Sequence, residues 1–213
     1  MKRRTIFLTI GAIALMLSTL VACGDVIGTY EEPRYNLVRG EQPFEIRDYE
    51  PLLVAEAVTK GPREEAISEG FRIIADFIFG NNISKRDIAM TTPVSQSSEI
   101  ITLTAPLSQS LENRDGMWRT RFTMPSKFTF ETLPKPVDER VQVSMTKPQR
   151  FAVIRFSGST RDAHLLEQQT KLEAWIKTEK LKPIALASYH FYNPPWTLPF
   201  LRRNEVWIEI SKN

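Results

Sequence analysis

The chain has 213 residues, of which 42% are hydrophobic and 25% charged, as in a folded globular protein with one ordinary domain or two small ones. The formal net charge of +3 comes from Lys2, Arg3 and Arg4, because without them the basic residues equal the 25 acidic ones. With this balance nothing indicates a basic nucleic-acid surface, so no nucleic-acid partner is expected. The single cysteine, Cys23, excludes an internal disulfide and a cysteine zinc cluster, and no GxSxG, HExxH or glycine-rich phosphate loop is present.

Residues 1–22 have the pattern of a secretory signal peptide. Basic residues precede a mainly apolar run that is short for a membrane span, which needs about 20 apolar residues. The run ends in Leu20-Val21-Ala22-Cys23-Gly24, which resembles the bacterial lipobox, whose cysteine is lipidated and becomes the mature N-terminus. The resemblance implies a lipid-anchored membrane protein of the cell envelope that faces the periplasm or the exterior, with the outer membrane favoured in a Gram-negative host. An ordinary signal peptide or an uncleaved anchor is the alternative.

Residues 23–34 lack periodicity and predict a tether, and residues 35–213 predict the folded domain. Two strands are expected at 44–49 and 52–58. Gly61-Pro62 then opens a helix, because the first helical turn does not use the donor that proline lacks. Its apolar stripe consists of Ile67, Phe71, Ile74 and Ile78, widened by Ala66, Ile73 and Phe77.

The second half of the chain repeats this pattern. Strands are expected at 87–92, 99–105, 117–124, 140–146 and 151–157. A second helix is expected at about 161–179, after a capping-box pattern at Ser159 and Asp162. Moved by about 98 residues, the first helical stripe falls on Leu165, Leu172, Trp175 and Ile176, which indicates an internal duplication.

We therefore predict an α+β fold in which a duplicated strand–strand–helix–strand–strand unit forms a distorted antiparallel eight-stranded barrel or sheet flanked by two helices. Two helices cannot cover both faces of about eight strands, so the sheet is expected to close on itself or to enclose a cavity.

The last strand combines unlike side chains. After the rigid loop Asn193-Pro194-Pro195-Trp196, the alternation at the end of the chain places aliphatic side chains on one face and Glu205 beside Trp207 on the other. The aliphatic side chains, Val206, Ile208 and Ile210, are expected to pack on the core. The other face is expected to be either a solvated surface or the wall of a pocket.

Several segments together resemble the SOUL haem-binding family. They are FEIRDY at 44–49 with Pro51, IAMTTPV at 88–94, FTMPSKFTFETLPKP at 122–136, VIRFSG at 153–158 and PPWTLPFLRRNEVWIEI at 194–210. The resemblance covers nearly the whole mature chain. It implies a duplicated distorted antiparallel barrel with two helices, and haem or another tetrapyrrole as the ligand. The fold is also similar to the effector-binding domains of gyrase-inhibitor-like proteins, which commonly keep a glutamate in a pocket.

From this resemblance we expect six ligand-binding residues. Phe71 and Phe77 are candidates for the wall of a haem slot, and Arg72 for a propionate partner, although core packing and a solvated arginine are the alternatives. Arg202 is a candidate for a ligand carboxylate, with Arg203 as the other possibility, and structural pairing with Asp48 or Glu205 is the alternative. Glu205 beside Trp207 is a candidate for holding a cation or for a raised pKa. No axial iron ligand is assigned, because the first helix has no methionine and no histidine.

The expected function is a lipid-anchored envelope protein that binds haem, another tetrapyrrole or a similar planar hydrophobic ligand, and is not an enzyme. Its expected partners are this ligand and, through lipid at Cys23, the membrane. Two alternatives stay open. One is an envelope module for structure or protein interaction without a small ligand, and the other is a hydrolase that uses Glu205 as a base.

Overall fold

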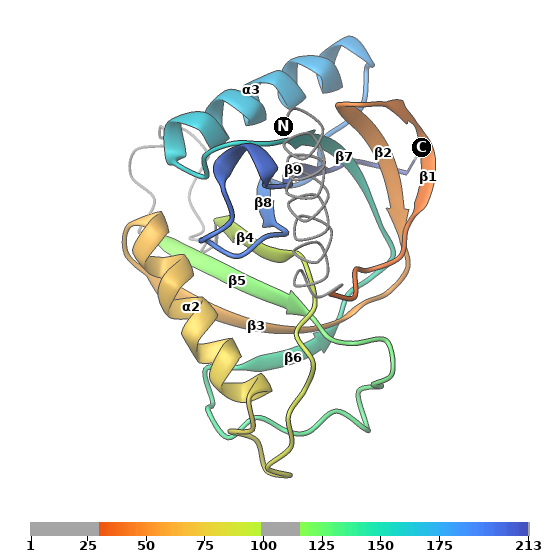
Figure 1. Ribbon diagram of the computed structural model, residues 1–213. Coiled ribbons are helices and arrows are strands. Elements are labelled where there is room, and N and C mark those ends of the chain that lie inside the picture. The colour runs from red at the N-terminus through yellow and green to blue at the C-terminus, as the bar shows by residue number, and fades with distance from the viewer. Residues whose placement is uncertain (1–29, 99–115, 213) are drawn as a thin grey trace, which may run out of the picture. The chain divides into compact units, whose positions relative to one another are not determined.

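A single antiparallel sheet organises the computed structural model, which describes residues 30–98 and 116–212. These residues form nine strands, two α-helices and one short 3-10 helix (Figure 1). In chain order the elements are β1 Asn36–Glu41, β2 Phe44–Tyr49, β3 Leu53–Lys60, α2 Arg63–Ile78, β4 Val94–Ser98, β5 Met117–Thr123, β6 Gln142–Met145, β7 Gln149–Phe156, α3 Asp162–Thr178, β8 Ser188–Phe191, η3 Pro199–Leu201 and β9 Asn204–Glu209.

The strand order β1-β2-β7-β9-β8-β4-β5-β3-β6 contains the predicted duplication. After β1, each half of the chain supplies two strands, a helix and two more strands. The strands of the first half are β2, β3, β4 and β5, and those of the second half are β6, β7, β8 and β9. Read from β2 to the middle of the sheet the order is β2-β7-β9-β8, and read from β6 to the middle it is β6-β3-β5-β4, so the two orders are equivalent. The third strands of the halves, β4 and β8, pair with each other in the middle. The first strand of each half lies beside the second strand of the other half. The two halves are therefore interlocked in one sheet.

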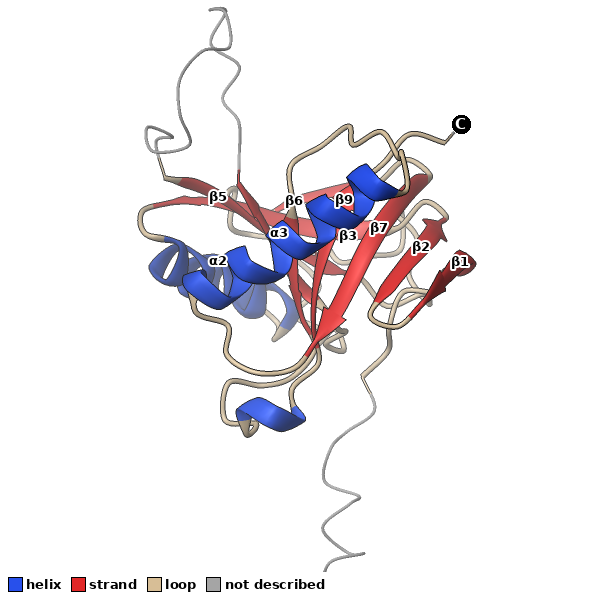
Figure 2. Ribbon diagram, turned by 90° about the horizontal axis from the view of Figure 1, so that it is seen from above, coloured by secondary structure: helices blue, strands red, loops and turns tan. Residues whose placement is uncertain are grey.

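Both helices pack on the same face of this sheet (Figure 2). Gly70 of α2 approaches Thr120 of β5, and Val206 of β9 belongs to the core cluster under α3. A continuous row of cross-strand neighbours joins these two positions and so fixes them on one face; it consists of Thr120, Gln96, Tyr189 and Val206. Neither α2 nor α3 covers the opposite face of the sheet.

The buried stripe of α2 contains five of the seven predicted apolar residues and is rotated away from the other two, Ile67 and Phe71. The side chains that face the sheet are those of Ala66, Ile73, Ile74, Phe77 and Ile78, with Gly70 between them. Phe71 lies at the margin of the stripe, where 36% of it is exposed. The rotation follows from Gly70, which lacks a side chain and lets the helix approach β5 closely.

Other details of the sheet differ from expectation. It has nine described strands rather than eight, and it is open, because β1 and β6 lie at its two ends and do not pair with each other. The strand expected at 87–92 is wrong: only isolated bridges occur there, and β4 starts after Pro93. The strand expected at 99–105 lies outside the described residues.

The N-termini of the two helices are tied to each other. The predicted capping box is wrong, because α3 has no side-chain cap hydrogen bond at its N-cap, Arg161. Asp162 instead accepts a hydrogen bond from Arg63, and the same guanidinium donates to the Thr160 carbonyl. Arg63 and Asp162 are the first residues of α2 and α3, so the pair joins equivalent positions of the duplicated halves.

The compact unit begins at Glu31, ahead of Tyr35, where the sequence pattern places the domain start. Glu31 forms a parallel bridge with Thr91, and its carboxylate accepts a hydrogen bond from the Ser126 amide at 2.9 Å. The predicted signal peptide, the lipobox and residues 23–29 of the tether lie outside the described residues. In the part of the chain that the structure describes, no helix is both long and apolar enough to span a membrane.

Candidate functional site

The face of the sheet opposite the helices carries polar and aromatic side chains. The predicted alternation of β9 is confirmed, because Val206, Ile208 and Ile210 lie in the cluster under α3. Trp207 belongs to a separate buried cluster with Tyr49. Glu205 shares its face and is fully buried. The structure thus places an acid and an indole side by side in the interior of the protein.

Glu205 is the centre of a buried hydrogen-bond network. Each of its two carboxylate oxygens accepts from Arg47, at 2.8 and 3.2 Å. Arg203 donates twice to one oxygen, at 3.0 and 2.9 Å. The other oxygen accepts from the Tyr192 hydroxyl at 2.9 Å and from the Trp207 indole at 2.7 Å. Protein donors therefore occupy both oxygens.

This network keeps Glu205 ionised. Burial by itself raises the pKa of a carboxyl group, but hydrogen bonds and positive charge from Arg47 and the charge of Arg203 lower the pKa of Glu205 to about 2. Burial also opposes ionisation of Arg47, and its bonds to Glu205 still raise its pKa. A carboxylate with a low pKa and no open acceptor position is poorly suited to act as a general base. The network is suited to joining β2 and β9 across β7.

A small hollow lies on the same face of the sheet, beside this network. Trp207 and His190 line it, and their rings stack with centroids 3.7 Å apart. His190 is 6% exposed; its Nε2 lies 2.8 Å from the Ser188 hydroxyl, and its Nδ1 has no hydrogen-bond partner among the described residues. Burial lowers the pKa of His190 to about 3, so this imidazole is neutral at ordinary pH. The hollow has a volume of about 210 Å³.

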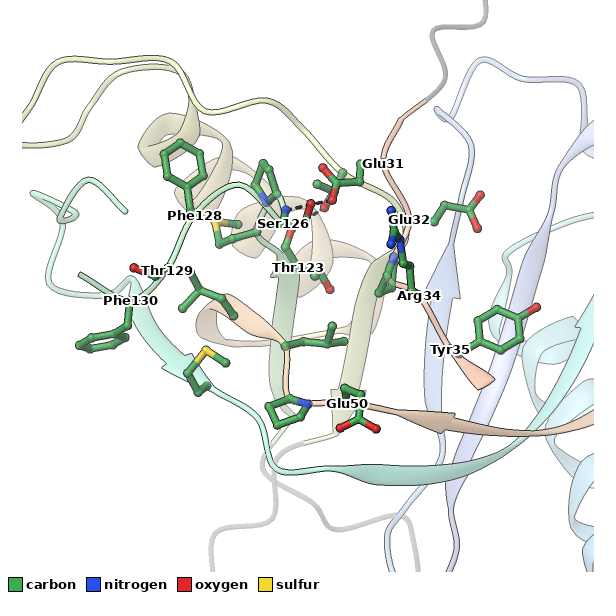
Figure 3. A pocket seen from close by; sticks show the side chains of 18 of the residues that line it. Glu31, Glu32, Arg34, Tyr35, Glu50, Thr123, Ser126, Phe128, Thr129 and Phe130 are labelled. Carbon is green, nitrogen blue, oxygen red and sulfur yellow. Dashed lines mark hydrogen bonds between the residues drawn. The ribbon is translucent and has the colours of Figure 1, made fainter. Parts of the chain in front are cut away.

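A larger cleft opens at the end of the sheet (Figure 3). Its volume is about 740 Å³. Residues 31–36 form one side, and the segment after β5 forms another, with the aromatic rings of Phe128 and Phe130. Leu52, Met124 and Met145 add further apolar walls. The cleft and the small hollow share Pro33, Leu52 and Thr123 as lining residues, so they are neighbours.

The charged groups around the cleft are mostly engaged. The Glu31 carboxylate is held by Ser126, Glu32 pairs with Arg203, and Asp48 pairs with Arg150. Arg34 lines the cleft, is exposed, and donates no hydrogen bond to any described residue, while its positive charge helps to lower the pKa of Glu31. Arg34 is therefore the guanidinium in this cleft that is available for a ligand carboxylate.

The structure separates the six predicted ligand residues into three places. Phe77 is buried in the core under α2, whereas Phe71 packs against Phe122 and Arg72 is exposed on the outer side of the helix. Arg202 donates to the carbonyls of Pro195 and Thr197 and so braces the loop before β9. Glu205 and Trp207 share one face of β9, which confirms the predicted alternation, and this face is buried rather than solvated. Their role in ligand binding stays a prediction.

Sequence reasoning missed the residues that shape the cleft. Phe128 and Phe130 lie in the segment 122–136, which its prolines make irregular, so no periodic pattern indicates which of its side chains converge. Arg47 lies in the segment FEIRDY, and the charge pattern of a single strand does not indicate that its partner is Glu205 of a distant strand. Among the described residues no three His, Cys, Asp or Glu side chains are grouped to hold a metal ion.

Comparison with known proteins places these motifs in a family. Residues 30–209 match the model of the SOUL heme-binding protein family. Heme-binding protein 1 of Xenopus laevis is 27% identical over 198 residues, which cover 86% of this chain and 94% of that protein. Heme-binding protein 1 of Mus musculus is 29% identical over 155 residues, which cover 71% and 75%.

Solved structures share the architecture at low identity. The EcmrR C-terminal domain superposes with a TM-score of 0.57 at 8% identity, covering 84% of this chain and 99% of that domain, which shows a common fold. The family match spans the sheet, both helices and the segments that form the buried network and the cleft. The chain therefore belongs to the SOUL heme-binding protein family.

Proposed function

We propose that this protein binds haem, another tetrapyrrole or a similar planar hydrophobic molecule in the cleft lined by Phe128 and Phe130. The observation that carries the proposal is the volume of the cleft, about 740 Å³, together with its apolar walls. Ligand pockets are typically about 300–1,000 Å³ and mostly apolar. Membership of a heme-binding family supports haem as the first ligand to test.

The residues of the cleft fit the parts of such a ligand. Phe128 and Phe130 offer aromatic surface to a flat ring system, and Arg34 is placed to pair with a carboxylate at the rim. Met145 lines the cleft and is 51% exposed, so its thioether sulfur is accessible from the cleft. Methionine sulfur is one of the axial ligands that haem iron takes in proteins. Bound haem supplies redox and ligand-binding chemistry at its iron, and the protein's part is to hold the macrocycle and shield it from water.

The inner face of the sheet is the less favoured place for this ligand. Its hollow of about 210 Å³ falls below the usual size of ligand pockets. Glu205, the polar centre of that face, already has protein donors on both oxygens. We therefore assign Glu205 and Arg47 to support of the fold beside the cleft.

We further propose that the protein works as a binding protein rather than as an enzyme, and that it is held at the membrane of the cell envelope by lipid on Cys23. The support for the anchor is the signal-peptide pattern of residues 1–22 followed by the lipobox-like segment. Conversion of Cys23 to serine is expected to release the protein from the membrane fraction.

The experiment is a haem titration of the chain from Glu31 to Asn213, followed by the Soret band and by tryptophan fluorescence. We expect saturable binding. Phe130→Ser is expected to weaken it by about tenfold, through loss of apolar contact. Arg34→Gln is expected to weaken it several-fold, while Arg34→Lys keeps the charge and most of the affinity.

The controls are Phe71→Ser and Arg72→Ala on α2, where the family resemblance placed the ligand. They are expected to leave the haem affinity unchanged. If they weaken binding while the substitutions in the cleft do not, the ligand lies on α2 and the assignment to the cleft is wrong. If no variant and no wild-type protein binds haem, haem is removed as the ligand.

A further inference from the structure

The loop between β8 and β9 exposes an unusual amount of apolar surface. Within six residues, Trp196 is 82% exposed, Leu198 55%, Phe200 69% and Leu201 63%. Large apolar side chains that gather at one exposed point of a soluble domain commonly mark an interaction surface. We call residues 194–201 the Trp196 loop.

The Trp196 loop is held in one shape. The Arg202 guanidinium donates to the Thr197 carbonyl at 2.7 Å and to the Pro195 carbonyl at 2.6 Å. The Gly158 amide donates to the Pro199 carbonyl at 2.9 Å, and the short helix η3 lies within the loop. Three prolines restrict its backbone further. The loop that exposes these apolar side chains is therefore held in one conformation by the fold. Binding to a partner surface would not need to order its backbone.

The Trp196 loop lies close to the point where the N-terminal segment joins the body. Glu32, the second residue of the compact unit, pairs with Arg203 at 2.9 Å. The Arg203 amide in turn donates to the Asn193 side chain at 2.6 Å, at the entrance of the loop. The short 3-10 helix of the loop stands at one edge of the domain (Figure 2).

The chain ahead of this point is short. Seven residues lie between Cys23 and Glu31, and a fully extended chain spans at most about 3.3–3.6 Å per residue. A lipid anchor at Cys23 would therefore keep Glu31 within about 30 Å of the membrane surface. Glu32, which directly follows Glu31, is in contact with Arg203 beside the apolar loop.

We propose that the Trp196 loop inserts into the interface of a lipid bilayer and so fixes the orientation of the domain on the membrane. Tryptophan and phenylalanine are suited to the interfacial region, where an apolar body meets water. Arg203, which follows the loop, is paired with Glu32 and Glu205, whereas Arg202 donates to two backbone carbonyls and, among the described residues, keeps an uncompensated positive charge beside the loop. This charge favours a bilayer that contains anionic lipid. The contact goes beyond ligand binding and does not depend on it.

The test uses the chain from Glu31 to Asn213, which contains the whole compact unit and lacks Cys23. It is mixed with vesicles of phosphatidylcholine that contain about one third phosphatidylglycerol, and the bound fraction is measured by flotation. We expect binding that is weaker on pure phosphatidylcholine. Replacing Trp196 and Phe200 together by serine is expected to reduce the bound fraction by about tenfold or more.

Two further variants make the test specific. Leu166→Ser removes an apolar side chain that is 59% exposed on α3, far from the loop in sequence, and is expected to float like the wild type. Trp196→Phe keeps the apolar side chain and is expected to float, but to lose the fluorescence quenching that brominated lipid produces in the wild type. Circular dichroism of each variant confirms that it is folded.

Several results would overturn the proposal. One such result is a wild-type protein that does not bind anionic vesicles. The others are a double serine variant that floats as well as the wild type, and quenching by brominated lipid that is unchanged in Trp196→Phe. If the chain dimerises in solution and the double serine variant is monomeric, the loop joins two copies instead. Because the assay contains neither haem nor a lipidated cysteine, its outcome is independent of the haem titration.

Discussion

Glu205 shows how a charge can be kept in the interior of this protein. A buried carboxylate is costly unless charges and hydrogen bonds compensate it. Arg47 and Arg203 supply the charges, and Tyr192 and Trp207 supply two more donors. The Arg203 guanidinium also lies over the Tyr192 ring, 3.8 Å from its centroid. The network therefore orders several aromatic side chains as well as the acid.

His190, the neighbour of this network, is expected to make stability depend on pH. Burial lowers its pKa to about 3 in the folded protein, against 6.5 for an unperturbed histidine. Between these values the unfolded chain binds a proton that the folded chain does not, so acid favours unfolding. The contribution is complete above pH 6.5 and is lost toward pH 3, at about 1.4 kcal/mol per pH unit.

His190→Phe tests this expectation, because it keeps a ring against Trp207 and cannot titrate. Urea unfolding of both proteins at about pH 7 and about pH 5 measures the slope, in a range above the one where Glu205 titrates. We expect the wild type to lose more stability over this interval than the variant. Equal slopes would mean that His190 is accessible to protons in the folded state.

At the scale of elements, helix α2 and strand β5 fit together through the smallest side chain available. A methyl group on Gly70 would lie 2.7 Å from the Thr120 Cβ atom, closer than packed carbon atoms allow. Arg63 anchors the start of the same helix to Asp162 of α3. The position of α2 is thus set by a close approach at its middle and by an ion pair at its N-terminus.

Gly70→Ala is expected to lower the free energy of unfolding by about 1–3 kcal/mol through overpacking. This is opposite to the gain of up to about 1 kcal/mol that alanine brings inside a helix. Urea denaturation measures the difference, and Arg72→Ala, at an exposed position of the same helix, serves as the control with an unchanged midpoint. A stabilised Gly70→Ala protein would show that the helix can move away from β5.

At the scale of the whole molecule, the body depends on residues that lie ahead of its first strand. The carbonyl of Glu31 accepts from the Thr92 amide and its carboxylate from the Ser126 amide, while Glu32 pairs with Arg203. Glu31, Glu32 and Ser126 also line the cleft, so these contacts join the N-terminal segment to the proposed ligand site. The interlocked halves and this segment are expected to unfold together.

A chain that starts at Tyr35 is therefore expected to be less stable than one that starts at Glu31, by about 1–2 kcal/mol for the lost hydrogen bonds and ion pair. A chain that starts at Glu31 is expected to unfold at the same urea concentration as the complete chain. Equal midpoints for the chains starting at Glu31 and Tyr35 would show that residues 31–34 add nothing to the fold.

Local patterns were sufficient for much of this architecture. The stripes at 3.6-residue spacing predicted α2 and α3, the repeat between them predicted the duplication, and period-two alternation placed Glu205 and Trp207 on one face of β9. The prediction was less successful where one small residue sets the geometry. Gly70 faces β5 in place of Phe71, because a residue without a side chain lets α2 pack closely against β5. Phe71 therefore lies at the margin of the buried face, although its side chain is larger and apolar.

The candidate sites were beyond the reach of such patterns. Arg47 and Glu205 are 158 residues apart, and their pairing depends on the strand order that brings β2, β7 and β9 together. The cleft likewise needs residues 31–36 and the segment after β5 to converge, although neither has regular periodicity. Hydrophobic periodicity records how each residue lies relative to its near neighbours in the chain. Contacts between distant segments form only when the sheet is assembled. The tertiary structure therefore decided the pairing of Arg47 with Glu205 and the lining of the cleft.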